Sequence, residues 1–435
     1  MNTLKIRGWA AACVATVLTV ASTERLSAAD WTEYRGPDNN GVTREKVMTS
    51  FPAGGPKVRW KVPSANGFSS FVVAGGRCYT QELRSLENTE QEVVVARNTD
   101  TGAELWVSSL GTMKVNTGGE SGTDKNRGGD GPRSTPATDG SHVWTFSAQL
   151  VLRCQDAKTG KEIWKHDLVK EFAGRNINWM NAQSPVIEGD LVFVAGGGPG
   201  QSLLAFKKND GSVVWKAFDD AMTHATCVPA TILGKRQIIF FVQKGLVAVD
   251  PTTGHELWRY PFPYNVSTAA SPVVDGDVVY CSAGYKVGAG AVRITKEGDA
   301  WKATEIYRFV GDKPLANHWS TPVLFQGHLY GMFQFKEYGS GPVKCVEIAT
   351  GKVKWEKPGF GPGHVILAGD KVVALSDGGE LVVFAADPNQ YNELARAQVL
   401  DGKCWTTPSL SGGRLYVRST KEAACLDVAR QRAQR

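Results

Sequence analysis

Three histidines recur at one position of a repeating pattern in this chain, and they are candidates for metal or ligand binding. His224, His318 and His364 each fall just before or at the start of an apolar run. Neutral imidazoles are good metal ligands and good hydrogen-bonding groups. These histidines lie far apart in sequence and lack the close spacing of a metal-ligand set. We therefore expect their side chains to form hydrogen bonds around a water-filled central channel, and we predict no metal site.

Tryptophans and an arginine occupy the same position in other repeats. Trp179, Trp319 and Trp405 could stack on a flat ring, such as that of a sugar or a quinone, or could pack structurally. Arg133 could hold a carboxylate or phosphate through two parallel hydrogen bonds, or could bond nearby carbonyls. The candidates for ligand binding at a channel mouth are Arg133, Trp179, Asn181, His224, Asn317, His318, Trp319, His364, Lys403 and Trp405. No catalytic residue is predicted.

A phrase that repeats along the chain sets these positions. It consists of Ser or Thr, Pro, an apolar run, a turn containing Gly, and a second apolar run, as in Ser271-Pro-Val-Val-Asp-Gly276. Short apolar runs separated by Asp-Gly or similar pairs predict β-hairpins. The prolines recur at steps of 43 to 50 residues from Pro136 to Pro322, and two further steps of 43 lead to Pro408.

A second phrase alternates with the first and places Gly four residues before a large aromatic residue. In Val151–Trp164 it reads as a strand, a tight turn at Thr159-Gly160 and a second strand. A Trp at a fixed point of an outer strand is suited to packing between neighbouring repeats. We therefore assign a structural role to Trp60, Gly102, Trp106, Gly160, Trp164, Gly211, Trp215, Gly254, Trp258, Gly351 and Trp355.

Both phrases count eight units, which predicts an all-β fold, an eight-bladed β-propeller of four-stranded antiparallel blades. A right-handed parallel β-solenoid is the alternative, but hairpin turns such as Asp275-Gly276 favour antiparallel blades. The strand around Trp60 precedes any complete unit, and the last unit, 404–428, has no such strand of its own. We therefore expect the N-terminal strand to join the C-terminal blade and close the ring.

The N-terminus predicts an exported protein. Lys5 and Arg7 precede the apolar run 8–22, and Ser27-Ala-Ala29 is typical of a signal-peptide cleavage site. Cleavage after Ser22 is the second possibility, and a membrane anchor is disfavoured because spanning takes about 20 apolar residues. The predicted division is 1–29 signal peptide, 30–56 leader draped over the domain, 57–428 propeller and 429–435 tail. We expect a periplasmic or secreted bacterial protein, with no transmembrane segment after cleavage.

Composition narrows the partners. The chain of 435 residues carries a net charge of +6, and its only basic cluster is in the C-terminal tail, so nucleic acid is excluded as a partner. Of the eight cysteines, Cys13 lies in the signal segment, and the odd remainder argues against a disulfide framework. Cys154 and Cys345 share a repeat position, which favours small buried side chains. We expect a monomer.

The Thr-Gly-x-x-x-Trp and Ser-Pro-x-x-x-Gly units resemble the propeller repeat of the pyrroloquinoline-quinone type over residues 30–428. Asp130–Pro136 and Ala395–Trp405 are similar to an exported bacterial subgroup of pyrroloquinoline-quinone-binding-like propellers. That subgroup is similar to the propeller lipoprotein of the outer-membrane β-barrel assembly machinery and falls in the quinoprotein alcohol dehydrogenase-like superfamily. The resemblance implies the fold but no cofactor, because the name describes the propeller.

The resemblance also frames two functions. The dehydrogenases of this superfamily hold the quinone and calcium with a vicinal Cys-Cys pair, a Trp floor, and acidic and amide ligands. Here no two cysteines are adjacent, and the mouth candidates are basic or neutral apart from Glu120, Asp124 and Asp130 in the insertion Leu110–Arg133. We predict a binding or scaffold module without a cofactor, holding a small ligand or a protein partner at the channel mouth. The alternative is a pyrroloquinoline-quinone-dependent dehydrogenase acting on alcohols or sugars with calcium.

Overall fold

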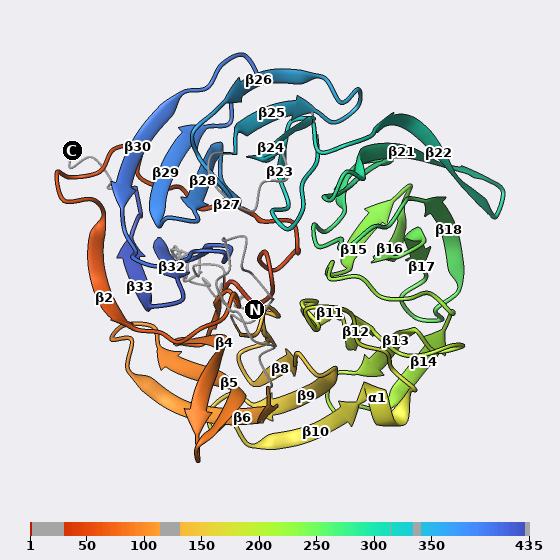
Figure 1. The fold of residues 1–435 in the computed structure, drawn as a ribbon, viewed down its shortest axis with the longest axis horizontal. Helices are drawn as coiled ribbons and strands as arrows, with labels where there is room; N and C mark the ends of the chain where they lie inside the picture. The colour runs from red at the N-terminus through yellow and green to blue at the C-terminus, as the bar shows by residue number, and fades with distance from the viewer. Residues whose placement is uncertain (2–29, 114–130, 314, 334–340, 431–435) are drawn as a thin grey trace.

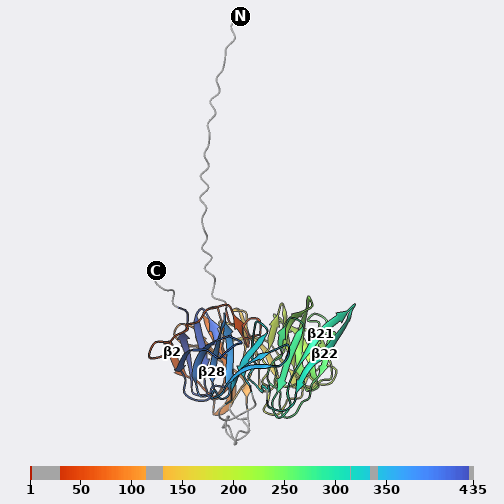
Figure 2. The same ribbon diagram turned by 90° about the horizontal axis from the view of Figure 1, so that it is seen from above.

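Eight sheets surround a central channel, seven of four strands and one of five, and each forms one blade (Figure 1). Seen edge-on, the ring is a flat disc (Figure 2). This computed structural model describes Met1 and residues 30–113, 131–313, 315–333 and 341–430. The predicted signal segment, the end of the tail and the insertion acids Glu120, Asp124 and Asp130 lie outside the described residues. The expected all-β propeller of antiparallel blades is confirmed.

Within blades 1 to 7 the strands follow chain order from the channel to the rim, and in blade 8 the early strand β2 is outermost. Blade 1 comprises β3 (Val72–Ala74), β4 (Arg77–Leu86), β5 (Thr89–Asn98) and β6 (Glu104–Thr112). Blade 2 comprises β7 (Ala137–Thr138), β8 (His142–Phe146), β9 (Val151–Asp156) and β10 (Glu162–Asp167), and α1 (Leu168–Glu171) follows it. Blade 3 comprises β11 (Val186–Glu188), β12 (Leu191–Ala195), β13 (Leu203–Lys207) and β14 (Val213–Ala217). Blade 4 comprises β15 (Val228–Ile232), β16 (Lys235–Val242), β17 (Gly245–Val249) and β18 (Glu256–Pro261).

The second half of the ring repeats this arrangement. Blade 5 comprises β19 (Val273–Asp275), β20 (Val278–Ala283), β21 (Gly288–Glu297) and β22 (Ala300–Phe309). Blade 6 comprises β23 (Val323–Phe325), β24 (His328–Met332), β25 (Val343–Glu347) and β26 (Val353–Lys357). Blade 7 comprises β27 (Gly363–Ala368), β28 (Lys371–Ser376), β29 (Glu380–Ala385) and β30 (Glu393–Gln398), with β1 (Val42–Thr43) added in parallel at its channel edge. Blade 8 comprises β31 (Ser409–Ser411), β32 (Arg414–Arg418), β33 (Glu422–Asp427) and β2 (Lys57–Pro63).

The ring closes as predicted. Strand β2 pairs antiparallel with β33, and Trp60 lies opposite Cys425 in the register. The N-terminal strand is thus the outer strand of the C-terminal blade. Because this pairing leaves no open edge at the joint, the ring is held together at the point where the chain begins and ends.

Aromatic residues on outer strands pack on glycines of the next blade. Trp164 of blade 2 covers Gly211 of blade 3, and its Nε1 donates to the Lys208 carbonyl at 3.0 Å. A Cβ at this glycine would lie 2.7 Å from the Trp ring, and its φ of +73° is one that favours glycine. The same contact joins Trp60 to Gly102, Trp106 to Gly160, and Trp215 to Gly254.

Local turn chemistry places the glycine under the aromatic ring. Asp156 Oδ1 accepts the backbone N–H groups of Lys158 and Thr159, at 3.0 and 2.8 Å, and Gly160 N donates to the Asp156 carbonyl at 2.8 Å. Such Asx turns arise because a short polar side chain bonds the backbone two or three residues on. The acidic or amide residue four positions before the glycine therefore helps to set the joint.

The joint between blades 4 and 5 departs from this scheme. Trp258 of blade 4 donates through Nε1 to Gln237 of its own blade, at 2.7 Å. The neighbouring strands β21 and β22 are long and turn at Gly298, beyond the reach of the Trp. Tyr260 OH donates instead to Glu305 of blade 5 at 2.5 Å, and the Arg308 guanidinium lies 3.7 Å from the centre of the Phe262 ring. Blades 4 and 5 are thus joined by polar and cation–π contacts.

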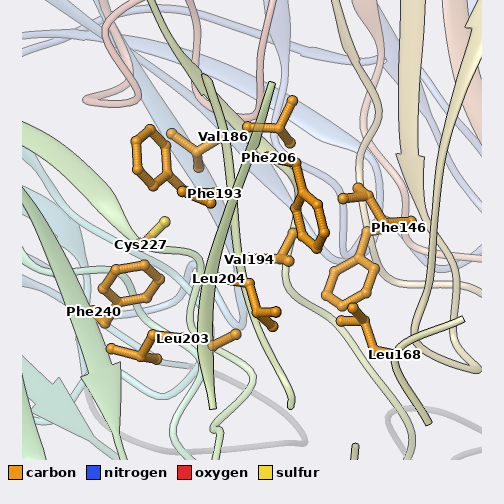
Figure 3. Packing of buried hydrophobic residues seen from close by; sticks show 14 of the residues in the cluster. Phe146, Leu168, Val186, Phe193, Val194, Leu203, Leu204, Phe206, Cys227 and Phe240 are labelled. Carbon is orange, nitrogen blue, oxygen red and sulfur yellow. The ribbon is translucent and has the colours of Figure 1, made fainter. Parts of the chain in front are cut away.

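Apolar side chains alternate along the middle strands and fill the space between blades. In Figure 3, Phe193 of β12 faces Phe240 and Cys227 of blade 4, whereas Phe206 of β13 faces Phe146 of blade 2. This alternation follows from the two-residue period of a strand. All seven cysteines of the described chain are buried and unpaired, which agrees with their expected role as small apolar residues.

The Ser and Thr residues of the Ser/Thr-Pro phrase join neighbouring inner strands. Each offers its hydroxyl oxygen to the backbone N–H of the equivalent residue in an adjacent blade. The bonds run from Ser70 N to Thr135 at 3.0 Å, Thr135 N to Ser184 at 3.0 Å, Ser184 N to Thr226 at 3.0 Å, Ser271 N to Thr321 at 2.9 Å, and Thr407 N to Ser70 at 2.9 Å. The repeat phrase thus supplies a hydrogen-bonded belt around the channel.

The leader lies inside the ring against the inner strands, whereas the sequence predicted that it would drape over the domain (Figure 1). Trp31 pairs with Val73 of blade 1, and Arg35 donates to the Thr321 carbonyl of blade 6 at 2.7 Å. Residues 32, 33, 42–43 and 45 bond blades 2, 3, 7 and 8. The leader thus supplies hydrogen-bond partners for six blades. No helix of the described chain is long and apolar enough to cross a membrane.

Candidate binding site in the channel

A cavity of about 140 Å³ lies where the inner strands begin, on the mouth side of the leader. Its walls come from all parts of the ring, because the segment that enters each inner strand ends at the channel. The lining residues are Tyr34, Phe68, Ser70, Arg133, Trp179, Ala182, His224, Thr226, Ser267, Ala269, Tyr285, His318, Trp319, His364, Trp405 and Thr407. Seven of the ten candidates named from the sequence are among them.

Aromatic rings form most of the wall. Trp405 lies at the centre of one group, 4.8 Å from Trp319 and 5.3 Å from Phe68 between ring centroids. Trp319 also lies 5.1 Å from the His364 ring. The Nε1 of Trp405 is buried without a hydrogen-bond partner among the residues that the structure describes. Large, rigid apolar surfaces with a few polar atoms are characteristic of sites that bind an apolar group.

The three imidazoles are neutral at pH 7. Burial lowers the pKa of His224 to about 4, and the pKa values of His318 and His364 to about 3. His224 Nε2 lies 2.9 Å from the Asn178 carbonyl, so it carries the proton, and Nδ1 accepts from the Ser267 hydroxyl at 2.9 Å. Groups with such low pKa values hold no positive charge and are weak bases at neutral pH, which suits binding better than proton transfer.

Arg133 is the charged member of the lining. Its guanidinium donates to the Trp179 carbonyl at 3.1 Å and lies 5.9 Å from the Phe68 ring centre. Trp179 and the following Met180 both have positive φ, +63° and +64°. Residues other than glycine rarely adopt a positive φ, and those that do are often found at binding and catalytic sites. The Arg133 contact thus holds Trp179 at the cavity.

Three predicted site residues lie outside the lining. Asn181 is buried and donates to the Phe146, Ser147 and Gln183 carbonyls, which fixes the loop before β11. Asn317 is buried, accepts from Tyr280 OH at 2.8 Å and donates to the Met332 carbonyl at 2.8 Å. Lys403 pairs with Asp377 at 3.3 Å and lies 5.6 Å from the Trp405 ring centre. The side chains of Asn181 and Asn317 thus bond within the blades, whereas Lys403 lies beside the ring of Trp405.

Several lining residues were not among those predicted from the sequence. Ser70, Thr226 and Thr407 belong to the hydroxyl belt, so the Ser/Thr positions of the repeat phrase were the signal that could have found them. Tyr34 comes from the leader, which has no repeat, and nothing in its spacing indicates that it reaches the cavity. The mouth is therefore closed at its inner end by a segment outside the propeller units.

Residues 89–320, more than half of the chain, match the family model described as outer membrane protein assembly factor BamB. The chain belongs to this family. Solved structures show the same fold at low identity. BamB from Moraxella catarrhalis has a TM-score of 0.59 at 15% identity, covering 87% of this chain and 99% of that one. The quinohemoprotein alcohol dehydrogenase ADHIIG from Pseudomonas putida HK5 has a TM-score of 0.65 at 13% identity, covering 94% and 81%.

One curated relative is similar in sequence. The quinoprotein ethanol dehydrogenase of Pseudomonas aeruginosa is 34% identical over 134 residues, 28% of this chain. The match spans only 21% of that enzyme's length. The likeness therefore supports a quinoprotein-like propeller and leaves the enzyme's activity outside what the match covers.

The dehydrogenase relatives raise the question of whether this cavity suits a quinone with calcium. Calcium requires several oxygen ligands, chiefly carboxylates and carbonyls. The described lining contains no carboxylate or amide side chain. Within the described residues, no group of three or more His, Cys, Asp or Glu could hold a metal. A cavity of about 140 Å³ is also smaller than the roughly 300–1,000 Å³ of typical cofactor sites. The described residues do not fit this cofactor.

Proposed function

We propose that this protein is a non-catalytic binding module whose channel mouth holds an aromatic or other apolar group of a protein partner. The observation that carries the proposal is the small cavity walled by Trp179, Trp319 and Trp405, with neutral imidazoles between the rings. A site of this size suits one side chain, and buried aromatic residues commonly anchor protein interfaces. The family's description, an assembly factor, fits a protein that acts by binding.

We further propose a periplasmic or secreted location, with residues 1–29 removed and 57–428 forming the propeller. The signal-like N-terminus and the outer-membrane role in the family's description support this location. The leader then belongs functionally to the propeller, because Tyr34 contributes to the lining of the mouth cavity.

Binding of a model side chain tests the proposal. Calorimetric titration with N-acetylphenylalaninamide should show binding, and N-acetylalaninamide should bind more weakly. Trp405→Leu and Trp319→Leu should each weaken it about tenfold, because each removes part of the aromatic wall. Trp301→Leu is the matched control, since Trp301 lies on β22 outside the cavity lining. Equal binding to all variants would place the site elsewhere.

A second arm addresses the dehydrogenase alternative. The purified protein is mixed with pyrroloquinoline quinone and calcium and passed over a gel-filtration column. We expect the quinone to separate from the protein and a redox dye to stay oxidised with alcohols or aldose sugars present. Retention of the quinone together with dye reduction would overturn the non-catalytic proposal.

A further inference from the structure

A second cavity, of about 460 Å³, lies further along the channel than the mouth cavity. The mouth cavity is lined by residues that precede the inner strands, such as Thr226, whereas this one is lined by residues at their ends, such as Thr231 of β15 and Gly276 after β19. Asp38, Thr231 and Gly276 are exposed, so the cavity is open to solvent. Its volume is within the roughly 300–1,000 Å³ range of ligand sites.

One residue of each inner strand, here called the inner-edge residue, directs its backbone N–H and carbonyl toward the channel. It is the second residue before the turn to the next strand. Val73 of β3 shows the geometry, because its N–H donates to the Trp31 carbonyl at 2.7 Å and its carbonyl accepts from Trp31 N at 2.9 Å. Alternate residues of an antiparallel pair direct both groups away from the partner strand. By the same register, the inner-edge residues are Val73, Thr138, Ile187, Thr231, Val274, Leu324, Leu367 and Leu410.

Leader residues 31–33 bond the inner-edge residues of blades 1, 2 and 3. The carbonyls of Trp31 and Thr32 accept from the N–H groups of blades 1 and 2 at 2.7 and 2.9 Å, and the Glu33 side chain accepts from that of blade 3 at 2.9 Å. Consecutive residues of one chain thus reach the N–H groups of neighbouring blades, at one residue per blade. Because the blades repeat around the ring, the N–H groups of blades 4, 5 and 6 have a similar spacing.

The inner-edge residues of blades 4, 5 and 6 line the second cavity, and the leader does not bond their N–H groups. They are Thr231, Val274 and Leu324. Outside their own blade ladders, the N–H groups of these three residues form no hydrogen bond among the described residues. The leader bonds blade 6 through the Arg35 side chain, which donates to carbonyls just before β23. The cavity is therefore bordered by three neighbouring strand edges that the leader leaves unpaired.

Apolar side chains form most of the remaining wall. They are Val42, Val228, Pro229, Ala230, Pro272 and Val273. The two arginines of the lining are already engaged, since Arg236 is paired with Glu188 at 2.5 Å and the terminal nitrogens of Arg35 donate to carbonyls at 2.7 to 2.9 Å. Backbone donors and acceptors beside an apolar wall match an extended peptide, because a peptide supplies main-chain groups of both kinds and side chains, whereas a simple anion only accepts.

From this arrangement we infer that the second cavity binds an extended, uncharged segment of a partner protein. The segment crosses the inner edges of blades 4, 5 and 6, as leader residues 31–33 cross those of blades 1, 2 and 3. Its successive carbonyls accept from the N–H groups of Thr231, Val274 and Leu324, and its own N–H groups donate to the strand carbonyls, as Trp31 N does to Val73. Unpaired strand edges are templates for the addition of a further chain.

Calorimetric titration of the purified protein with acetyl-Val-Thr-Val-amide tests the inference, since β-branched residues favour an extended chain. A matched peptide with an N-methylated Thr keeps the side chains, loses one main-chain donor and places a methyl group at the strand edge. Sodium acetate offers an acceptor without a chain. We expect the unmodified peptide to bind at least about tenfold more tightly than either, because main-chain hydrogen bonds give an added strand its affinity. If neither peptide binds, if both bind equally, or if acetate binds as tightly, the inference is wrong.

Proline variants assign the binding to the strand edges. Thr231→Pro removes the N–H that faces the cavity, and proline is tolerated on an edge strand where its nitrogen lies outside the ladder. Thr231→Val keeps the N–H and is the matched control at this exposed position. Val274→Pro and Val274→Thr repeat the comparison in blade 5. Each proline variant should weaken acetyl-Val-Thr-Val-amide binding about fivefold, the effect of one lost hydrogen bond, and each control should bind normally.

A third variant covers the case in which proline disturbs the strand. Thr231→Trp keeps the backbone N–H but places a large ring at the cavity, so it should abolish peptide binding, and Leu233→Trp is its control on the adjacent exposed turn. Circular dichroism shows which variants are folded. Normal peptide binding by a folded Thr231→Trp variant would overturn the inference. Trp405→Leu should leave peptide binding intact, and Thr231→Trp should leave N-acetylphenylalaninamide binding intact, so the two cavities are tested separately.

Discussion

The rim and the channel of this propeller use the same repeat in opposite ways. At the rim, four joints repeat one contact, a Trp ring on a glycine of the next blade, with φ values of +72° to +73°. At the mouth, the equivalent positions carry different residues, including Arg133, Trp179, His224 and Trp405. Within one repeat, the outer-strand position at these joints is always Trp, whereas the position before the inner strand differs from blade to blade.

This difference separates stability from recognition. A contact repeated around a ring adds the same stabilisation at each joint and identifies nothing in particular, since each blade interacts mainly with its neighbours. A site lined by unlike residues from many blades is asymmetric and can discriminate between partners. The blade 4–5 joint shows that the rim itself tolerates an exception, because Tyr260 and Glu305 bridge the joint there instead of a Trp–Gly contact.

Breaking a rim joint should have the largest effect on stability. Trp164→Ala removes a buried aromatic ring and its bond to the Lys208 carbonyl, so we expect the free energy of unfolding to fall by about 3–5 kcal/mol. Urea unfolding followed by circular dichroism measures the change. Trp301→Ala, at a half-buried position on the long β22 strand, is the control and should cost less than half as much. A similar loss of unfolding free energy in both variants would show that the Trp–Gly joints contribute no more to stability than other positions on the outer strands.

The rim and the mouth also differ in how far the sequence predicts them. Eight blades, the ring closure at Trp60 and the convergence of inner-strand starts all follow from the period, because spacing alone determines which residues share a level of the ring. The path of the leader could not be predicted, since residues 30–56 have no repeat and the Thr321 carbonyl that accepts from Arg35 lies 286 residues away in sequence. Side-chain direction also escaped prediction, as Asn181 and Asn317 show by pointing into the blades.

Ionisation of Glu33, the buried acid of the leader, should have the next largest effect on the free energy of unfolding. Burial raises the pKa of Glu33 from 4.5 to about 8, with Glu188 and Asp38 adding to the rise and bonds from Ile187 N and Asn39 opposing it. The stabilisation from this acid is fully present below pH 4.5 and is lost as the pH rises through 8. At ~1.4 kcal/mol per pKa unit, and with local relaxation, the loss is on the order of 3 kcal/mol.

Glu33→Gln should abolish that loss, because the amide stays neutral and its carbonyl can still accept from Ile187 N. Urea unfolding at pH 5 and pH 9 measures the difference between the two proteins. Glu45→Gln is the control, since Glu45 lies at the outer part of the leader and bonds Gly412 and Gly413 of blade 8. An unchanged pH dependence in Glu33→Gln would show that Glu33 is already ionised at neutral pH.

Residues at the mouth should give the free energy of unfolding a pH dependence opposite in sign to that from Glu33, and smaller for each residue. Burial lowers the pKa of His364 from 6.5 to about 3, and the nearby Arg35 charge lowers it further. Its neutral form therefore stabilises the fold above pH 6.5, and that stabilisation is lost as the pH falls toward 3. His364→Gln, compared with His255→Gln at an exposed site, should reduce the loss of unfolding free energy between pH 7 and pH 5 by about 2 kcal/mol. Equal pH profiles for the two variants would mean that protonation of His364 is not linked to folding. The pH dependence of stability in the channel would then come from Glu33 of the leader.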